Sequence, residues 1–416
     1  MRVSKFGSKI AVTSGIGRLM DDLALAGGED MLMLGGGNPA HIPPVQECFR
    51  RSMEKLLGGP GAFERTIGDY DPPQGNADFI DALCGLLNDQ FGWDLRPQNV
   101  ALTNGSQMAF FILFNLFAGQ FDDGATKKIL LPLAPEYIGY CDVGLTEDLF
   151  VANRPDIEHI DKHIFKYHVA FDKINIGDDI GAICVSRPTN PTGNVLTDSE
   201  VQKLTALARD HKIPLIIDNA YGMPFPNIVF TQATCTWDLN TILCMSLSKL
   251  GLPAARTGIV IANEEVISMV AKVNAVMSLA PGSLGASLAT EMIRSRQILH
   301  LSAEVIRPFY QKKADAAVQQ LHHGLDGLDF HIHKPEGAFF LWLWLRDLPI
   351  TSARLYEKLK ERGVVVVPGH YFFPGLAGPW RHKDECIRVN YSGDDNTVHK
   401  GIDIICDQVR REYQSG

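Results

Sequence analysis

Residues 241–262 read TILCMSLSKLGLPAARTGIVIA and hold two apolar runs, 241–246 and 258–262, on either side of a segment rich in Ser, Gly and Pro. An apolar run of about 4–8 residues bounded by turn residues predicts a strand that is buried on both faces. The first run ends at a serine, and Lys249 follows three residues later. This stretch therefore predicts a buried strand, a loop that carries polar side chains, and a second buried strand.

Further apolar runs precede this stretch, and polar residues follow each of them. They lie at 99–103, 128–132, 182–186 and 214–218. Helix-length segments such as 108–117 and 198–211 alternate with the runs, which predicts an α/β domain with a mostly parallel sheet covered by helices. Ligands of such sheets bind beyond the carboxyl ends of the strands. Candidate residues follow the strand ends at Gly105 and Ser106, at Asn190, at Asp218 and Tyr221, and at Ser246 through Lys249.

A second, smaller domain of α+β type is predicted towards the end of the chain. A long helical pattern runs from about 283 to 323, and short apolar runs follow at 339–344 and 363–368. We expect residues 1–55 to form an N-terminal arm and part of the small domain, 56–300 to form the large domain, and 301–416 to form the C-terminal small domain.

Composition excludes several classes of protein. The 416 residues are 45% hydrophobic and 21% charged, which is ordinary for a globular chain. A net charge of −9 opposes nucleic-acid binding, which needs a basic surface. The first residues lack the apolar core of a signal peptide, and no run approaches the roughly 18 apolar residues of a membrane span. We therefore expect a cytoplasmic protein.

Metal and disulfide chemistry are not expected. The eight cysteines are scattered and form no C-x-x-C pair, so neither a disulfide framework nor a structural zinc site is predicted. His331 and His333 would point to one face of a strand, as two metal ligands could. No third ligand is evident, so we interpret them as part of a surface strand.

Lys249 is the centre of the predicted chemistry. A lysine amine attacks an aldehyde cofactor only in its neutral form, which burial and a nearby positive charge such as Arg256 both favour. Taken alone, Lys249 could equally be a surface lysine in a Ser/Gly-rich loop. It is preceded in order by Asn190-Pro-Thr-Gly and by Asp218-Asn-Ala-Tyr221. The ordered set predicts a site for pyridoxal phosphate.

The chain resembles the fold-type I, class I aminotransferases over the range from about Gly35 to Tyr391. The strings that carry the resemblance are LGGGNPA, YDPPQG, ALTNGSQ, LAPEYIGY, SRPTNPTGNV, DNAYG, SLSKLGLP and VPGHYFFPG. Each string is weak by itself, and their number and order make the likeness specific. The resemblance implies a pyridoxal-phosphate enzyme with a large cofactor-binding domain and a smaller second domain.

The resemblance also implies roles for residues around the cofactor ring. Lys249 would hold the cofactor aldehyde as a Schiff base and then move a proton between the substrate and the cofactor. Asp218 would face the pyridine nitrogen and keep it protonated. Tyr221 and Asn190 would bind the ring oxygen, although Asn-Pro-Thr-Gly is also a good turn sequence. Tyr137 would stack on the ring.

The cofactor phosphate is expected at the start of the helix that follows Gly105. Gly105, Ser106 and Gln107 would offer free N–H groups and the positive end of the helix dipole. Ser246 and Arg256 would complete the cup, since arginine offers forked donors to phosphate oxygens.

The substrate and the second subunit are also placed by resemblance. Arg388 would bind the substrate carboxylate, with Gly37 and Asn190 beside it. Tyr70 matches the tyrosine that reaches the phosphate of a neighbouring subunit, which implies a homodimer with shared active sites. Arg18, Arg187 and Arg307 are alternatives for binding a second carboxylate of an acidic substrate.

Within the family, the strings are most similar to members that use small aliphatic amino acids. This likeness implies transfer of the amino group between valine and pyruvate by a ping-pong route. The alternative enzyme is a β-elimination lyase or an aminotransferase for aromatic or acidic amino acids, with the same cofactor site. The non-enzyme alternative is the ligand-sensing module of a transcription regulator, and no basic helix-turn-helix is seen before Gly35.

Overall fold

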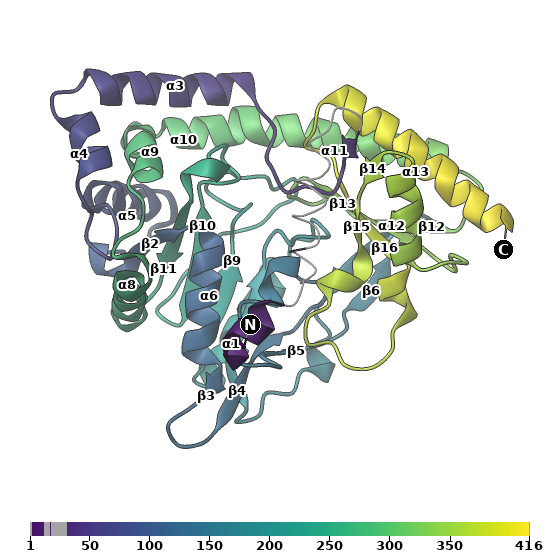
Figure 1. Ribbon diagram of the computed structural model, residues 1–416, viewed down its shortest axis with the longest axis horizontal. Coiled ribbons are helices and arrows are strands. Elements are labelled where there is room, and N and C mark those ends of the chain that lie inside the picture. Colours follow the sequence, from purple (N-terminus) through teal and green to yellow (C-terminus); the bar gives the residue numbers. More distant parts are fainter. Residues whose placement is uncertain (1, 12–16, 18–30, 416) are drawn as a thin grey trace.

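The larger sheet forms the centre of the molecule (Figure 1). The computed structural model describes residues 2–11, 17 and 31–415. In this part of the chain the sheet has eight strands in the order β2-β11-β10-β9-β8-β4-β3, with β5 also paired to β4. The strands are β2 (Val100–Asn104), β3 (Gly119–Gln120), β4 (Thr126–Leu131), β5 (Phe150–Ala152), β8 (Ile180–Ser186), β9 (Leu215–Asp218), β10 (Thr241–Ser246) and β11 (Thr257–Ile261). Strands β5, β4, β8, β9 and β10 pair in parallel, whereas β11 and β3 run against their neighbours, so the mostly parallel sheet is confirmed.

Alternate residues of these strands enter two different apolar cores. In β10, Ile242 and Cys244 pack with helix α6 (Ser106–Phe117), and Leu243 and Met245 pack on the opposite face. Both faces are covered, which is why every residue of β10 is buried and the four central residues are apolar. The covering helices also include α5 (Ala77–Phe91), α7 (Asp198–Asp210), α8 (Glu264–Ser278) and α9 (Leu284–Arg294).

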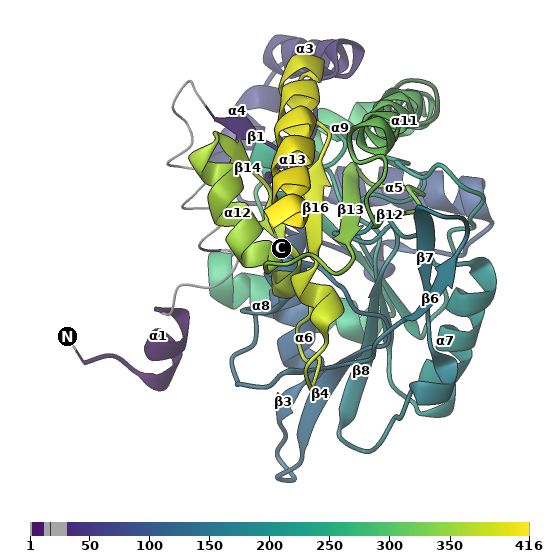
Figure 2. The ribbon, with the colours of Figure 1, turned by 90° about the vertical axis from the view of Figure 1, so that its right-hand side faces the viewer.

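A second sheet of six strands lies beside the first, in the order β15-β16-β13-β12-β7-β6 (Figure 2). Its strands are β6 (Asp156–His159), β7 (Ile164–His168), β12 (Phe330–His333), β13 (Phe340–Leu345), β15 (Val367–Pro368) and β16 (Cys386–Asn390). Helices α11 (Arg307–Gly324), α12 (Ser352–Glu361) and α13 (Asp395–Ser415) accompany it. The sequence analysis did not identify β6 and β7, which come from the middle of the chain and pair in parallel with β12 through β7.

The N-terminal part of the chain is joined to the second sheet region. Strand β1 (Leu32–Met33) pairs in parallel with β14 (Val364–Val365), and the Asn390 N–H donates to the Leu34 carbonyl at 2.7 Å. The chain then passes through Gly35–Gly37 into helices α3 (Pro43–Gly58) and α4 (Ala62–Gly68). A short helix, α1 (Lys5–Ile10), precedes this region. The pairing places three glycines between the two sheets.

The expected helical stretch after residue 283 is interrupted. Helix α9 ends at Arg294, and α10 (Gln297–His300) restarts after Arg296, whose φ of +61° breaks the helix. A π-helical segment, Leu301–Ile306, then leads directly into α11. Figure 1 shows α10 and α11 as one long rod that spans the top of the molecule.

The interpretation of His331 and His333 as part of a surface strand is wrong. Their strand, β12, lies inside the second sheet, and the two residues are 6% and 0% exposed. His333 Nε2 accepts from the Tyr167 N–H at 3.1 Å, and Nδ1 donates to the Lys334 carbonyl at 2.9 Å. Burial lowers the pKa of His333 to about 3, so the ring is neutral at pH 7. His333 therefore has a structural role.

The described residues contain neither a metal-binding cluster nor a membrane-spanning helix. Within 2–11, 17 and 31–415, no group of three or more His, Cys, Asp or Glu residues could hold a metal ion. No helix in these ranges is long and apolar enough to cross a bilayer. All eight cysteines lie in the described ranges and are free thiols.

Candidate active site

The carboxyl ends of the central strands meet at one cavity. Ser186 at the end of β8 is level with Asp218 at the end of β9, and Lys249 follows β10. The cavity between them has a volume of about 180 Å³. Its lining residues are Gly37, Ser106, Gln107, Phe110, Tyr137, Ile138, Asn190, Asp218, Ala220, Tyr221, Ser248, Lys249, Arg256 and Arg388.

Ten of the thirteen residues predicted from the sequence line this cavity, and Gly105, Ser246 and Tyr70 do not. Gly105 is the N-cap of α6, directly before the lining residue Ser106. The Ser246 hydroxyl accepts from the Ser248 N–H at 3.0 Å and contacts the Thr257 carbonyl at 3.4 Å. Ser246 therefore braces the loop, and Ser248 is the serine that reaches the cavity. Tyr70 is 81% exposed.

Lys249 has the environment of a nucleophilic amine. Its Nζ donates to the Gly37 carbonyl at 2.7 Å and lies 5.5 Å from the ring centroid of Tyr221. Burial lowers the pKa of Lys249 to about 8, helped by the positive charges of Arg388 and Arg256 and opposed by Asp218. A pKa in this range leaves an appreciable neutral fraction near pH 7, which nucleophilic attack requires.

Asp218 is the acidic group that lines the cavity. Its Oδ2 accepts from the Tyr140 hydroxyl at 2.8 Å, and its Oδ1 accepts from the Ala220 N–H at 3.0 Å. Burial raises the pKa of Asp218, while these two donors and the positive charge of Lys249 act in the opposite direction. The sequence analysis missed Tyr140, which lies three residues after Tyr137 and is completely buried. Its signal was present in the string LAPEYIGY, which contains both tyrosines.

An anion-binding cup is formed where α6 begins. Ser106 and Gln107 start the helix, so their N–H groups have no partner within it. Gly105 has a φ of +85°, and a Cβ added there would lie 2.2 Å from Arg256 Nη2. Only a glycine lets the Arg256 guanidinium approach the helix N-terminus this closely. A helix N-terminus beside an arginine suits a phosphate group.

Two tyrosines provide flat apolar surfaces at the cavity. Tyr221 is 5% exposed and packs edge-on against Phe339, with 5.1 Å between ring centroids. Tyr137 packs against Gly139, where an added Cβ would lie 2.3 Å from the tyrosine ring. The Gln107 amide fixes the same turn by donating to the Gly139 carbonyl at 2.7 Å. Such fixed rings can hold a planar ligand by stacking.

Arg388 is a buried cation without a counterion. It is 2% exposed, and none of the ion pairs in the described part of the chain includes it. Its Nη1 donates to Asn190 Oδ1 at 2.8 Å, its Nη2 donates to the Gly35 carbonyl, and its Nε has no partner. Burial lowers the pKa of Arg388 to about 10. A buried, partly unpaired guanidinium is costly unless an anion binds it, so it marks a carboxylate site.

Two of the other arginines considered for an acidic substrate, Arg187 and Arg307, do not line the cavity. Arg187 donates to the carbonyls of Leu196 and Thr234 and pairs with Asp198 at 2.6 Å. Arg307 is exposed at the start of α11. Arg18 lies outside the described residues.

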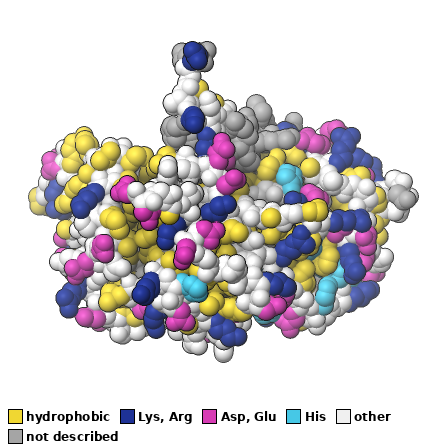
Figure 3. Space-filling model, turned by 90° about the horizontal axis from the view of Figure 1, so that it is seen from below, with side chains coloured by type: hydrophobic (Ala, Val, Ile, Leu, Met, Phe, Trp, Pro, Cys, Tyr) yellow, Lys and Arg dark blue, Asp and Glu magenta, His cyan; other side chains and the backbone are white. Residues whose placement is uncertain are grey.

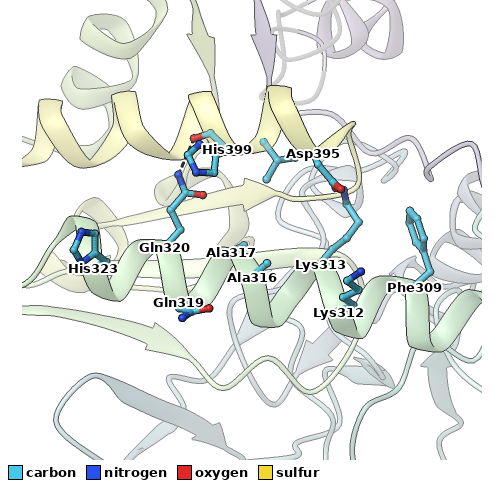
Figure 4. A pocket seen from close by; sticks show the side chains of 11 residues that line it. Phe309, Lys312, Lys313, Ala316, Ala317, Gln319, Gln320, His323, Asp395 and His399 are labelled. Carbon is cyan, nitrogen blue, oxygen red and sulfur yellow. Dashed lines mark hydrogen bonds and ion pairs between the residues drawn. The ribbon is translucent and has the colours of Figure 1, made fainter.

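A second hollow of about 530 Å³ lies between α11 and α13 (Figure 4). It contains none of the predicted site residues. Lys313 pairs with Asp395 across it, and Gln320 donates to the His399 carbonyl at 2.8 Å. Two of its polar side chains, Lys313 and Gln320, are thus bound to residues of α13, whereas Lys249, Asp218 and Arg388 all line the first cavity. Convergent polar groups with shifted pKa values favour the smaller cavity as the active site.

The residues of the smaller cavity fit pyridoxal phosphate. A phosphate requires the cup of α6 and Arg256, an aldehyde requires a neutral amine such as Lys249, and a pyridine nitrogen requires an acidic partner such as Asp218. Three cationic groups, Lys249, Arg256 and Arg388, face a single carboxylate in the lining. This excess of positive charge suits an anionic cofactor together with an anionic substrate.

Gly105→Ala should weaken the binding of pyridoxal phosphate roughly tenfold or more, because the new Cβ displaces Arg256 and about 1.5–3 kcal/mol of charged hydrogen bonding is lost. Gly124→Ala is the matched control, since Gly124 also has a φ of +85° and an added Cβ there meets nothing within 4 Å. Both variants should lose about 1–2 kcal/mol of stability through backbone strain. Titration with cofactor and thermal unfolding separate the two effects. Equal affinities in the two variants would contradict the cup.

Comparison with known proteins agrees with this geometry. Residues 44–405 match the family described as "Aminotransferase class I and II". The chain is 51% identical over 414 residues to the valine–pyruvate aminotransferase of Escherichia coli (strain K12), with 99% of each chain covered.

Solved structures extend this likeness to three dimensions. A putative amino-acid aminotransferase from Psychrobacter arcticum 273-4 is 48% identical with a TM-score of 0.97, and the match covers 100% of both chains. The valine-pyruvate aminotransferase from Salmonella typhimurium LT2 is 51% identical with a TM-score of 0.89, covering 96% of this chain and 100% of the other. These matches extend over almost the whole length, and the chain belongs to the class I and II aminotransferase family.

Proposed function

We propose that the protein is a pyridoxal-phosphate aminotransferase that exchanges an amino group between L-valine and pyruvate, giving 3-methyl-2-oxobutanoate and L-alanine. The observation that carries the proposal is the buried Arg388 without a counterion, which shares a cavity with the Lys249 amine and apolar side chains. The name of the relative in Escherichia coli supports the choice of substrates.

Lys249 performs the proton transfer in this proposal. When bound, pyridoxal phosphate supplies an aldehyde that takes up the amino group and a ring that withdraws electrons. Lys249 Nζ, as a neutral amine, would hold the cofactor aldehyde, and the same amine would accept the proton from the substrate α-carbon. The Gly37 carbonyl, 2.7 Å from Nζ, orients the amine toward the cavity.

Other residues hold the ring and the substrate. Asp218 keeps a proton on the pyridine nitrogen, which requires a carboxylate that stays ionised. Tyr221 and Asn190 donate to the ring oxygen, and Tyr137 covers one face of the ring. Arg388, which lines the cavity and has no counterion, binds the substrate carboxylate through its guanidinium group.

The cavity favours a substrate with one carboxylate. Arg256 is directed to the start of α6, so Arg388 is the remaining arginine of the lining. Apolar or aromatic residues such as Phe110, Ile138 and Tyr221 occupy much of the remaining wall. A small aliphatic side chain fits such a wall, whereas a second carboxylate would be buried without a cation.

The visible absorbance of the purified protein with pyridoxal phosphate tests this function. L-Valine and L-alanine, added singly, should convert the cofactor band to that of the amine form, and pyruvate should restore it. Lys249→Ala should lack the starting band. Conversion by L-aspartate alone would overturn the substrates, turnover without a 2-oxo acid would indicate the elimination reaction, and no Lys249-dependent band would reject the cofactor.

Arg388→Leu should lower kcat/KM for valine roughly 30-fold or more, because a buried charge pair is worth about 2–5 kcal/mol. Arg388→Lys should recover little of this loss, since an ammonium cannot reproduce the planar fork. The cofactor band should persist in both variants. Arg307→Leu is the control for a solvent-exposed arginine and should leave the kinetics unchanged. A normal kcat/KM in Arg388→Leu would remove Arg388 from the substrate site.

The proposal includes a homodimer that shares its active sites. Ile67 and Tyr70 are 64% and 81% exposed, and Val276 and Leu279 are 86% and 61% exposed. The Asn274 amide donates to the Pro73 carbonyl at 2.9 Å, so α8 lies beside the loop of Tyr70. Figure 3 shows hydrophobic side chains grouped at the left end of the molecule, the end that carries α4 and α8 in Figure 1. An apolar surface of this kind supports a subunit contact.

Sedimentation of the purified protein should give about twice the chain mass of 45.8 kDa. Val276→Asp should weaken the dimer, because the contact would bury an unpaired charge. Ile160→Asp is the control, since Ile160 is 45% exposed but lies beside the β6–β7 pair in the second sheet. A wild-type protein that sediments as a single chain would contradict the dimer.

A further inference from the structure

The hydroxyl groups of Ser186 and Tyr140 connect Asp218 to the buried Glu136. Glu136 Oε2 lies 2.5 Å from Ser186 Oγ, Ser186 Oγ lies 3.2 Å from the Tyr140 hydroxyl, and that hydroxyl lies 2.8 Å from Asp218 Oδ2. Glu136 and Tyr140 are 1% and 0% exposed. We call these four residues the Glu136 chain. No step of the proposed function uses Glu136 or Ser186.

The four groups of the Glu136 chain hold too few protons for all their contacts if both carboxyl groups are ionised. Three contacts link its four groups, and each contact needs one proton between its two oxygens. Ser186 and Tyr140 supply one proton each, because a hydroxyl group has a single hydrogen. With both carboxylates ionised, Ser186 Oγ and the Tyr140 hydroxyl would face each other with lone pairs alone. A third proton, on Glu136 or on Asp218, gives each of the three contacts a hydrogen bond.

The surroundings place this proton on Glu136. Burial raises the pKa of Asp218, but the Tyr140 hydroxyl, the Ala220 N–H and the positive charge of Lys249 all stabilise its ionised form. Glu136 accepts the Ser186 N–H at 2.8 Å, and the acidic group that acts on it is Asp218, with no cation among the groups that shift it. Burial raises the pKa of Glu136 to about 8. All three hydrogen bonds then point in one direction, from Glu136 toward Asp218.

We propose that Glu136 is held protonated and is the terminal donor of a hydrogen-bonded chain through Ser186 and Tyr140 that keeps Asp218 ionised and fixed toward the pyridine nitrogen. The role toward the cofactor rests on the proposed function. Glu136 touches neither cofactor nor substrate, so it is a positioning residue. The proton on Glu136 lets Ser186 donate to Tyr140, and Tyr140 is then free to donate to Asp218.

Two substitutions by side chains of similar size separate the effect of the hydrogen-bond donor at position 136 from the effect of side-chain packing. In Glu136→Gln, the amide NH₂ replaces the protonated oxygen and donates to Ser186 Oγ, while the amide oxygen accepts the Ser186 N–H. In Glu136→Leu, both contacts are lost. The variant Glu200→Gln is the control, because Glu200 is also a buried glutamate, and hydrogen bonds from Val169 and Thr197 hold its pKa below the usual value.

Infrared spectroscopy of the protein without cofactor reads the proton directly. At pH 7 the wild type should show the C=O stretching band of a protonated carboxyl group, and this band should be absent in Glu136→Gln and present in Glu200→Gln. In the wild type the band should disappear as the pH is raised through about 8, since Glu136 then ionises. Lys249 titrates in the same range, so the infrared band rather than a rate reports Glu136. A band that persists in Glu136→Gln, or is missing from the wild type, would overturn the proposal.

The half-reaction with valine tests the link to Asp218 in the loaded enzyme. Glu136→Gln should keep a rate within about threefold of the wild type, and Glu136→Leu should be roughly tenfold slower, because hydrogen bonding to a charged group weakens. Equal rates in both variants would overturn the positioning role. Infrared bands as expected together with no Lys249-dependent absorbance would reject the proposed function and leave the proton on Glu136 established, so the two failures are distinct.

Discussion

Three consecutive backbone carbonyls hold the cations of the active site in place. The carbonyl of Gly37 accepts from Lys249 Nζ, that of Gly35 accepts from Arg388, and that of Gly36 accepts from the Asn390 amide at 2.6 Å. Lys249 follows the large sheet, and Arg388 belongs to the second sheet, so this short segment fixes their relative positions. A Cβ at Gly35 would lie 3.2 Å from the Val366 carbonyl, which leaves little room for a side chain. The positions of the two charges that define the site, Lys249 and Arg388, thus depend on the backbone of Gly35–Gly37.

The charges that line the cavity favour the binding of a ligand at the expense of the stability of the protein without ligand. Burial lowers the pKa of both Lys249 and Arg388, and the charge of Arg388 lowers that of Lys249 further, which means that the folded chain bears an electrostatic cost. Asp218 offsets part of this cost from the opposite wall. Such unfavourable burial is typical of functional sites, where a ligand completes the charge balance.

The strands that could be predicted from the sequence are those that are buried along their whole length. Strands such as β10 are covered on both faces, so their central residues are apolar without interruption and the strand is recognisable. Strand β6 is an edge strand with the mostly exposed sequence DIEH, and it carries no such pattern. His333 was misplaced for a related reason, since a histidine in a strand reads as exposed until the tertiary contact with Tyr167 is known.

The site residues also divide into those that a local sequence pattern reveals and those that it does not. Lys249, Asp218 and Asn190 are recognisable because each follows a buried strand in a fixed order. Glu136 lies in a loop and Tyr140 ends the short 3-10 helix that follows it, and their partners Ser186 and Asp218 are 46 to 78 residues away along the chain. Hydrogen bonds between such distant residues leave no local spacing to detect. Ser246 was assigned to the phosphate cup by resemblance, and this role stays a prediction; in the structure its hydroxyl accepts from the Ser248 N–H.

The insertion of β6 and β7 from the middle of the chain affects how the protein can be made. Strand β7 covers the edge of β12, and β12 is translated more than 160 residues later. During synthesis the β6–β7 pair has an unpaired edge until β12 has been translated. A fragment containing residues 301–416 alone would expose the matching edge of β12. Open strand edges of this kind promote aggregation. The second sheet is therefore a product of the complete chain, and neither half of the molecule can be expressed separately without losing a strand partner.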